Sequence, residues 1–212
     1  MTPDRVTVLV AGDPGIGAPP AVPVGAEIDV VGQVDTGNEA ISMVLTELPD
    51  VLLLDTRIVE TDARAVCRRI REWAPATRVL AATEHDDEQA YTTVVAGAAG
   101  AVRRDVDNST IVAALCEVAR GESVLLPRMA SRLLHDLDAW AERSADPLHP
   151  PPTLTATERE VLTRIGQGVD PAMIAVTHAV TSHLVNLHAG FAVAKLHRYV
   201  LGSERIAADR RR

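Results

Sequence analysis

Short runs of hydrophobic residues alternate with amphipathic stretches along the first 120 residues of the chain. The runs lack the polar alternation of a half-exposed strand, which is typical of strands buried on both faces. Predicted strands lie at residues 5–11, 27–33, 51–54, 77–82 and 99–103, and predicted helices at 37–48, 62–73, 86–96 and 109–120. This alternation predicts an α/β fold whose doubly wound, five-stranded parallel sheet carries helices on both faces.

One connection departs from this rhythm. Residues 12–25, GDPGIGAPPAVPVG, contain four Gly and four Pro where a helix is expected. Proline removes amide donors and glycine disfavours helix, so we expect a loop or a single turn, and one face of the sheet poorly covered. The glycines of residues 12–17 are also compatible with a phosphate-binding loop of an enzyme. We disfavour that alternative, because the loop lacks a Lys-Ser/Thr pair and Pro19 and Pro20 interrupt any helix start.

The second part of the chain predicts a set of helices. The first begins at Pro127 and runs to residue 140, and the proline-rich residues 144–153 predict an extended connector. Thr155 and Glu158 form a capping-box pattern at the start of the next helix. Asp170 and Pro171 predict the start of a short helix that ends near residue 178. A third helix is expected over residues 181–196 and a fourth over 198–208, and the tight turn at 178–181 is typical of a helix-turn-helix.

Charge is distributed unevenly between these parts. The net charge of the whole chain is −8; residues 1–152 carry 13 Arg against 24 acidic residues, whereas residues 153–212 carry 8 basic against 5 acidic residues. Only the second part is therefore expected to approach nucleic acid. Cys67 and Cys116 lie in apolar helical patterns that favour buried free thiols. No apolar run reaches the ~20 residues of a membrane span, so we expect no membrane association and a cytoplasmic location.

Polar residues follow several of the predicted strands. Asp55 ends the buried run Val51–Leu54, Asp13 follows the first strand, Thr83 the fourth and Arg104 the fifth. Carboxyl ends of parallel strands meet at one edge of the sheet, where ligands bind in such folds. Two carboxylates there suit Mg²⁺, and a carboxylate nucleophile suits phosphoryl transfer. Each residue taken alone is also an ordinary cap or turn residue.

The order and spacing of six segments resemble the response regulators of the NarL/FixJ type, which join a receiver domain to a LuxR-type helix-turn-helix. The segments are VLVAGDP (8–14), LPDVLLLDTRI (48–58), RVLAAT (78–83), AGAAGAVRRD (96–105), ARGESVLLP (119–127) and LTATEREVLTRIGQG (154–168). The resemblance implies a flavodoxin-like receiver over 1–125, a linker helix and connector over 126–153, and a DNA-binding domain over 154–212. It makes Asp55 the phosphoacceptor, and Asp13, Asp55 and the backbone carbonyl of Arg57 the Mg²⁺ ligands. Thr83 and Arg104 would sense the phosphoryl group.

Several positions depart from the family pattern. The pair of acids after the first strand is Gly12-Asp13, and the lysine after the fifth strand is replaced by Arg104. The bulky switch residue falls on Ala101, and Met-Pro-Gly after the phosphoacceptor reads Ile58-Val59-Glu60. We therefore expect an atypical receiver that binds Mg²⁺ weakly. Phosphorylation of Asp55 by a histidine kinase and regulation independent of phosphorylation both stay open.

The resemblance also makes residues 181–196 the recognition helix. Its signature Thr-Val-Lys-x-His-Val reads Leu184-Val185-Asn186-Leu187-His188-Ala189, and positions that often carry lysine are Asn186 and Gly190. Asn186 is expected to read adenine and Leu187 to contact a thymine methyl group. The remaining expected DNA contacts are Thr181, Ser182, His183, Lys195 and Arg198.

These observations favour a DNA-binding transcriptional regulator, not an enzyme, that acts on double-stranded DNA as a homodimer or as a heterodimer with another regulator. The alternative is a pseudo-receiver that pairs with another regulator and has weak or no DNA binding of its own. The four histidines of the tail do not follow the i, i+4 spacing of a helical metal site, which favours ordinary packing and surface roles.

Overall fold

The computed structural model describes residues 5–12, 27–86, 88–143 and 152–209. The chain divides into two compact units, residues 1–124 and 125–212, which are described separately. The connection at residues 13–25, which we predicted to be a loop, falls outside the described residues. None of the described helices is long and apolar enough to cross a membrane.

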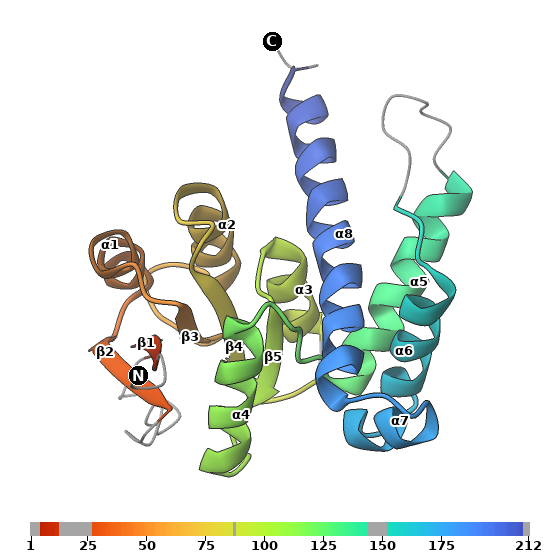
Figure 1. Ribbon diagram of the computed structural model, residues 1–212. Coiled ribbons are helices and arrows are strands. Elements are labelled where there is room, and N and C mark those ends of the chain that lie inside the picture. Colours follow the sequence, from red (N-terminus) through yellow and green to blue (C-terminus); the bar gives the residue numbers. More distant parts are fainter. Residues whose placement is uncertain (1–4, 13–26, 87, 144–151, 210–212) are drawn as a thin grey trace. The chain divides into compact units, whose positions relative to one another are not determined.

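The first unit contains a five-stranded parallel sheet (Figure 1). Its strands are β1 (Val6–Ala11), β2 (Ile28–Val34), β3 (Val51–Asp55), β4 (Arg78–Thr83) and β5 (Gly100–Arg103). They lie in the order β2-β1-β3-β4-β5, the flavodoxin-like arrangement, and every neighbouring pair is parallel. The predicted fold class is confirmed.

In the part of this unit that the structure describes, four helices cover the sheet: α1 (Gly37–Glu47), α2 (Ala63–Trp73), α3 (Glu88–Ala96) and α4 (Asn108–Ala119). The α4 side chains Ile111, Leu115 and Val118 pack with one set of alternating strand residues, which includes Val8, Val10, Leu53 and Leu80. Successive strand side chains point to opposite faces, so the fully buried Leu52 and Leu54 face the other side, where α1, α2 and α3 lie. Within the described residues α4 is the one helix on its face.

The edge of β5 is covered by the chain that follows α4. The N–H of Ala101 donates to the carbonyl of Val124 at 2.9 Å. A Cβ atom at Gly100 would lie 2.3 Å from that carbonyl oxygen, so the close approach requires glycine there. The segment that follows α4 and ends at residue 124 therefore belongs to the first unit and covers this edge of its sheet.

The second unit consists of α5 (Pro127–Arg143), α6 (Ala156–Gly166), α7 (Pro171–Thr177) and α8 (Ser182–Asp209). The predicted caps are confirmed: Thr155 and Glu158 make a reciprocal capping box, and Asp170 caps α7 with Pro171 in its first turn. The core of this unit includes six buried aliphatic residues: Val161, Leu162, Ile165, Ile174, Val185 and Leu196.

The prediction of two separate helices after residue 181 was wrong, because α8 runs unbroken through residues 182–209. No proline interrupts it, and the segment around His197 consists of residues that a helix tolerates. The ring of Tyr199, beyond the expected break, lies 5.1 Å from the ring of Trp140 on α5. This packing favours continuation of the helix past residue 197.

The helix α5, which we assigned from sequence to the connection between the domains, packs against α6 within the second unit. The guanidinium of Arg159 donates to both carboxylate oxygens of Asp138, at 2.7 and 2.8 Å. A Cβ atom at Gly166 would lie 2.4 Å from the hydroxyl oxygen of Ser131, so glycine permits the close contact of the two helices.

Candidate functional site

Asp55 is the last residue of β3 and its side chain is only 2% exposed. Thr83 ends β4, and Arg104 directly follows β5. The three residues therefore lie at the carboxyl edge of neighbouring parallel strands, as predicted. A guanidinium nitrogen of Arg104 lies 2.6 Å from Oδ2 of Asp55, which makes a largely buried ion pair.

The other carboxylate oxygen of Asp55 faces Arg57. The backbone N–H of Arg57 donates to Oδ1 at 2.9 Å, and the Nε atom of the same residue lies 3.7 Å from that oxygen. The Arg57 guanidinium also contacts the carboxylate of Glu84 at 3.3 Å. Both oxygens of Asp55 thus have a cationic neighbour, and the negative charge expected to attract a metal is already compensated.

Thr83 is buried, and its hydroxyl donates to the backbone carbonyl of His85 at 2.9 Å. The N–H of Arg104 donates to the backbone carbonyl of Thr83 at 2.8 Å, which ties the end of β4 to the residue that pairs with Asp55. Ala101 is completely buried in β5. A methyl group has no rotamers to exchange, so this position offers no ring that could follow a movement of Thr83.

A pocket of about 380 Å³ opens beside this ion pair. It is lined by three arginines, two carboxylates and one histidine: Arg57, Arg103, Arg104, Glu84, Asp105 and His85. Arg103 pairs with Asp105. The lining contains more fixed cations than anions, which suits an anionic group such as a phosphoryl group better than a metal ion.

The predicted Mg²⁺ ligands are only partly visible. Asp13 falls outside the described residues. Gly12 stands at the other position of the acidic pair and has no carboxylate. Residues 5–12, 27–86, 88–143 and 152–209 contain no group of three His, Cys, Asp or Glu side chains that could hold a metal. Because guanidinium groups contact both oxygens of Asp55, the described residues fit Mg²⁺ poorly.

The start of α8 presents an exposed polar surface in the second unit. Thr181, Ser182 and His183 are exposed, and Oγ1 of Thr181 accepts the N–H of Leu184 at 3.3 Å as a helix cap. Farther along the helix Leu187 and Gly190 are partly exposed, and Arg198 is exposed. Because their side chains are accessible, these positions can contact a long partner molecule that lies along the helix.

Two of the expected DNA contacts need correction. Asn186 is only 5% exposed, because it lies on the face of α8 that points into the helical unit. A side chain buried in this way cannot reach a base edge, so the expected reading of adenine by Asn186 does not fit the structure. Sequence reasoning placed it by its position in the family signature and could not see which face the helix buries.

Lys195 is the second correction. Its ammonium group donates to both oxygens of Glu158 at 2.6 and 2.9 Å and to the carbonyl of Thr153 at 3.0 Å. Burial acts to raise the pKa of Glu158, but hydrogen bonds from Lys195 and Thr155 outweigh it and hold the pKa below its usual value. Lys195 therefore joins α8 to the start of α6 and is not a dedicated phosphate contact.

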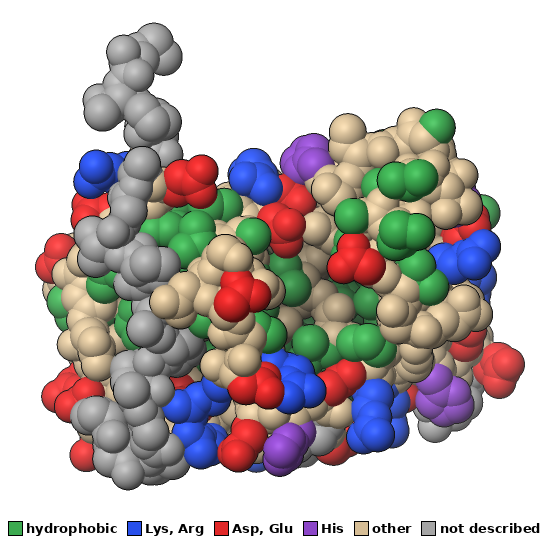
Figure 2. Space-filling model, turned by 90° about the horizontal axis from the view of Figure 1, so that it is seen from below, with side chains coloured by type: hydrophobic (Ala, Val, Ile, Leu, Met, Phe, Trp, Pro, Cys, Tyr) green, Lys and Arg blue, Asp and Glu red, His purple; other side chains and the backbone are tan. Residues whose placement is uncertain are grey.

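Sequence reasoning missed the exposed apolar side chains on α7, on α8 and in the turn between them. Val176, Val180, Leu184 and Phe191 are all exposed. The signal for one of them was present, since Leu184 occupies the threonine position of the recognition-helix signature. Figure 2 shows acidic and basic side chains interspersed with hydrophobic ones on the face that it displays.

The comparisons with known proteins agree with the fold. The family described as the response regulator receiver domain matches residues 25–116. A probable transcriptional regulatory protein NarL of Mycobacterium tuberculosis is 32% identical over 210 residues, which is 97% of this chain and 93% of that protein. The DNA-binding transcriptional activator DevR/DosR of the same organism is 32% identical over 171 residues, which is 80% of this chain and 77% of that protein.

Solved structures give the same result. The receiver domain of the M. tuberculosis NarL protein has a TM-score of 0.51 and 33% identity, covering 56% of this chain and 99% of that one. RcsB of Salmonella enterica, solved bound to a promoter, has a TM-score of 0.52 over 92% of this chain and 93% of that chain; at 19% identity it supports the fold alone. The fold and the strand-end carboxylate define a response regulator. The chain belongs to the NarL-type family of response regulators.

Proposed function

We propose that this chain is a DNA-binding transcriptional regulator that acts as a dimer, with Asp55 as the phosphoacceptor of its receiver. The observation that supports this most is collinearity: a NarL relative named as a transcriptional regulator matches 97% of the chain, across both units. The exposed first turn of α8 supports DNA binding, because a helix-turn-helix reads the major groove with the start of its second helix. A histidine kinase is the proposed phosphoryl donor, and the cytoplasm the proposed location.

In the receiver we propose that Arg104 and Thr83 hold the phosphoryl group on Asp55. A guanidinium at 2.6 Å from the carboxylate is already placed to pair with phosphoryl oxygens. Thr83 would exchange its bond to the His85 carbonyl for one to the phosphoryl group. Arg57 supplies further positive charge on the other side of Asp55.

Mg²⁺ is proposed to bind weakly, through Asp13, Asp55 and the backbone carbonyl of Arg57. We expect a dissociation constant on the order of millimolar, because one family carboxylate is missing and the Asp55 oxygens are engaged by arginines. The measurement is a Mg²⁺ titration followed by amide chemical shifts around residue 55, with Asp55→Asn as the control. Tight, micromolar binding would contradict the proposal. A titration without chemical-shift changes would show that Mg²⁺ does not bind at this site.

The receiver is also proposed to switch weakly. Ala101 stands where a bulky residue would move together with Thr83. A phosphoryl mimic therefore makes few contacts that differ between the inactive and active states, and it can shift the equilibrium between them only weakly. We expect beryllofluoride to change dimerisation or DNA affinity by less than tenfold, or about 1.4 kcal/mol. Sedimentation and DNA binding with and without the mimic measure this, and a larger change would reveal a different route of coupling.

For DNA contact we propose the exposed side of α8. Thr181, Ser182 and His183 would contact phosphates, with Arg198 as a further cation, and Leu187 would meet a thymine methyl group. Leu184 joins this set because it is exposed in the first turn of α8. Among the described cations of this unit, Lys195 and Arg159 are held in ion pairs and are less available for DNA. A dimer on paired half-sites doubles the number of phosphate contacts.

The test places a carboxylate at the proposed interface. Ser182→Glu should lower the affinity of the full chain for duplex DNA at least tenfold in a mobility-shift assay, because the new charge faces the phosphates. The matched control is Ala194→Glu, which adds the same charge at an exposed position of the same helix about 18 Å farther along. Equal losses for both variants would show that the start of α8 is not the interface.

A further inference from the structure

A pocket between α6, α7 and α8 has a chemistry that DNA binding does not use. It has a volume of about 270 Å³ and nine lining residues. Five of these are aliphatic: Val161, Ile174, Val180, Leu184 and Val185. Pockets that take drug-sized ligands measure ~300 to 1,000 Å³, so this one suits a smaller molecule, of one ring or two fused rings.

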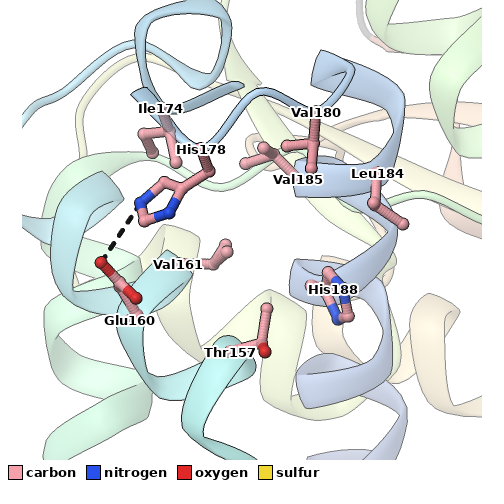
Figure 3. A pocket seen from close by; sticks show the side chains of 9 residues that line it. All are labelled: Thr157, Glu160, Val161, Ile174, His178, Val180, Leu184, Val185 and His188. Atoms are coloured by element: carbon pink, nitrogen blue, oxygen red, sulfur yellow. Dashed lines mark ion pairs between the residues drawn. The ribbon is translucent and has the colours of Figure 1, made fainter. Parts of the chain in front are cut away.

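The polar groups of the pocket lie on its opposite sides (Figure 3). On one side Nε2 of His178 lies 3.2 Å from the carboxylate of Glu160, so these two groups satisfy each other. On the other side is His188, whose ring meets the ring of Phe191 edge-on at 6.0 Å. Val161 lies between the two sides and separates them with an apolar surface.

The Nδ1 atom of His188 is buried and has no hydrogen-bond partner among the described protein atoms. A buried polar atom without a partner is unfavourable and needs an explanation. In the neutral ring whose Nε2 carries the proton, Nδ1 presents a lone pair and accepts a hydrogen bond. His188, which lines this aliphatic pocket, thus has a buried acceptor that lacks a donor.

We propose that this pocket binds a small aromatic molecule that carries one N–H or O–H donor, with the donor directed at Nδ1 of His188. The aliphatic lining would receive the ring, and the hydroxyl of Thr157 offers a second polar contact at the edge. Such a ligand would contact Leu184 and His188, which belong to the proposed DNA-reading helix. Binding itself can be measured without DNA, so the inference stands apart from the proposed function.

The probes are indole and benzofuran, which share one bicyclic shape but differ in that benzofuran has no donor. Titrated into the full chain, indole should shift the amide signals of pocket residues in a saturable way. It should bind about three- to tenfold more tightly than benzofuran, the range expected for one hydrogen bond. His188→Leu should remove that preference, whereas His183→Leu, on the same helix outside the pocket lining, should keep it.

Two results would overturn the proposal. One is the absence of saturable shifts with either probe. The other is that indole and benzofuran bind with equal affinity and that His188→Leu changes neither affinity. If His188→Leu does not fold, Leu184→Trp provides a second variant, because it enlarges a side chain at the exposed rim of the pocket. Loss of indole binding in folded Leu184→Trp supports the site. Unchanged binding there places the ligand elsewhere and overturns it.

Discussion

Replacing Arg104 by alanine is expected to lower the free energy of unfolding of the first unit by about 2 to 4 kcal/mol. The substitution leaves the Asp55 carboxylate, which is 2% exposed, without its partner at 2.6 Å. Removing one member of a buried ion pair costs about 3 to 5 kcal/mol, and the remaining charge of Arg57 at 3.7 Å reduces that loss. Denaturant unfolding followed by the fluorescence of Trp73, in a Trp140→Phe background, reports on this unit.

The neighbouring residue supplies the control. Arg103 pairs with Asp105 on the surface, where such pairs contribute at most about 1 kcal/mol, so Arg103→Ala should have little effect. Adding Asp55→Asn to Arg104→Ala should recover part of the stability, because the unpaired buried charge is then absent. Equal losses for Arg103→Ala and Arg104→Ala would contradict the importance given to the buried pair.

The second large effect is expected at Lys195. Lys195→Ala should destabilise the helical unit by about 1 to 3 kcal/mol, because the buried Glu158 carboxylate loses both hydrogen bonds from the ammonium group. Trp140 fluorescence in a Trp73→Phe background measures it. Arg198→Ala, an exposed cation one turn farther along α8, is the control and should change stability by less than about 0.5 kcal/mol.

The same pair predicts a dependence on pH. Because the pKa of Glu158 is lowered in the folded state, its stabilisation is complete above the unfolded value of about 4.3 and is lost as the pH falls through the lower folded value. The stability difference between wild type and Lys195→Ala should therefore shrink as the pH is lowered from 6 towards about 3. A difference that stays constant over this range would exclude the Glu158 ion pair as its cause.

The sheet could be predicted from sequence because its strands are uninterrupted apolar runs, of which Val51–Leu54 is the clearest. The caps at Thr155 and Asp170 could be predicted because they depend on neighbouring residues alone. The break expected near His197 was wrong because continuation of α8 is favoured by a contact distant in sequence, between Tyr199 and Trp140. Local pattern does not contain that information.

The candidate site shows the same division. The placement of Asp55, Thr83 and Arg104 at one edge of the sheet follows from strand ends in a parallel sheet and was predicted. The approach of the Arg57 side chain to Asp55 was missed, because side-chain direction in a loop cannot be read from spacing. The DNA roles of Asn186 and Lys195 were assigned by family position, which does not tell whether a helix side chain is buried or already paired.

The proposed function requires the helical unit to read DNA as part of a dimer. This can be measured by selecting duplexes from a random pool with the full chain at low salt and sequencing them. We expect enrichment of two related half-sites about one helical turn apart, or a multiple of it, and loss of that enrichment in Ser182→Glu. A selected pool with no preferred sequence, from folded and dimeric protein, would contradict it.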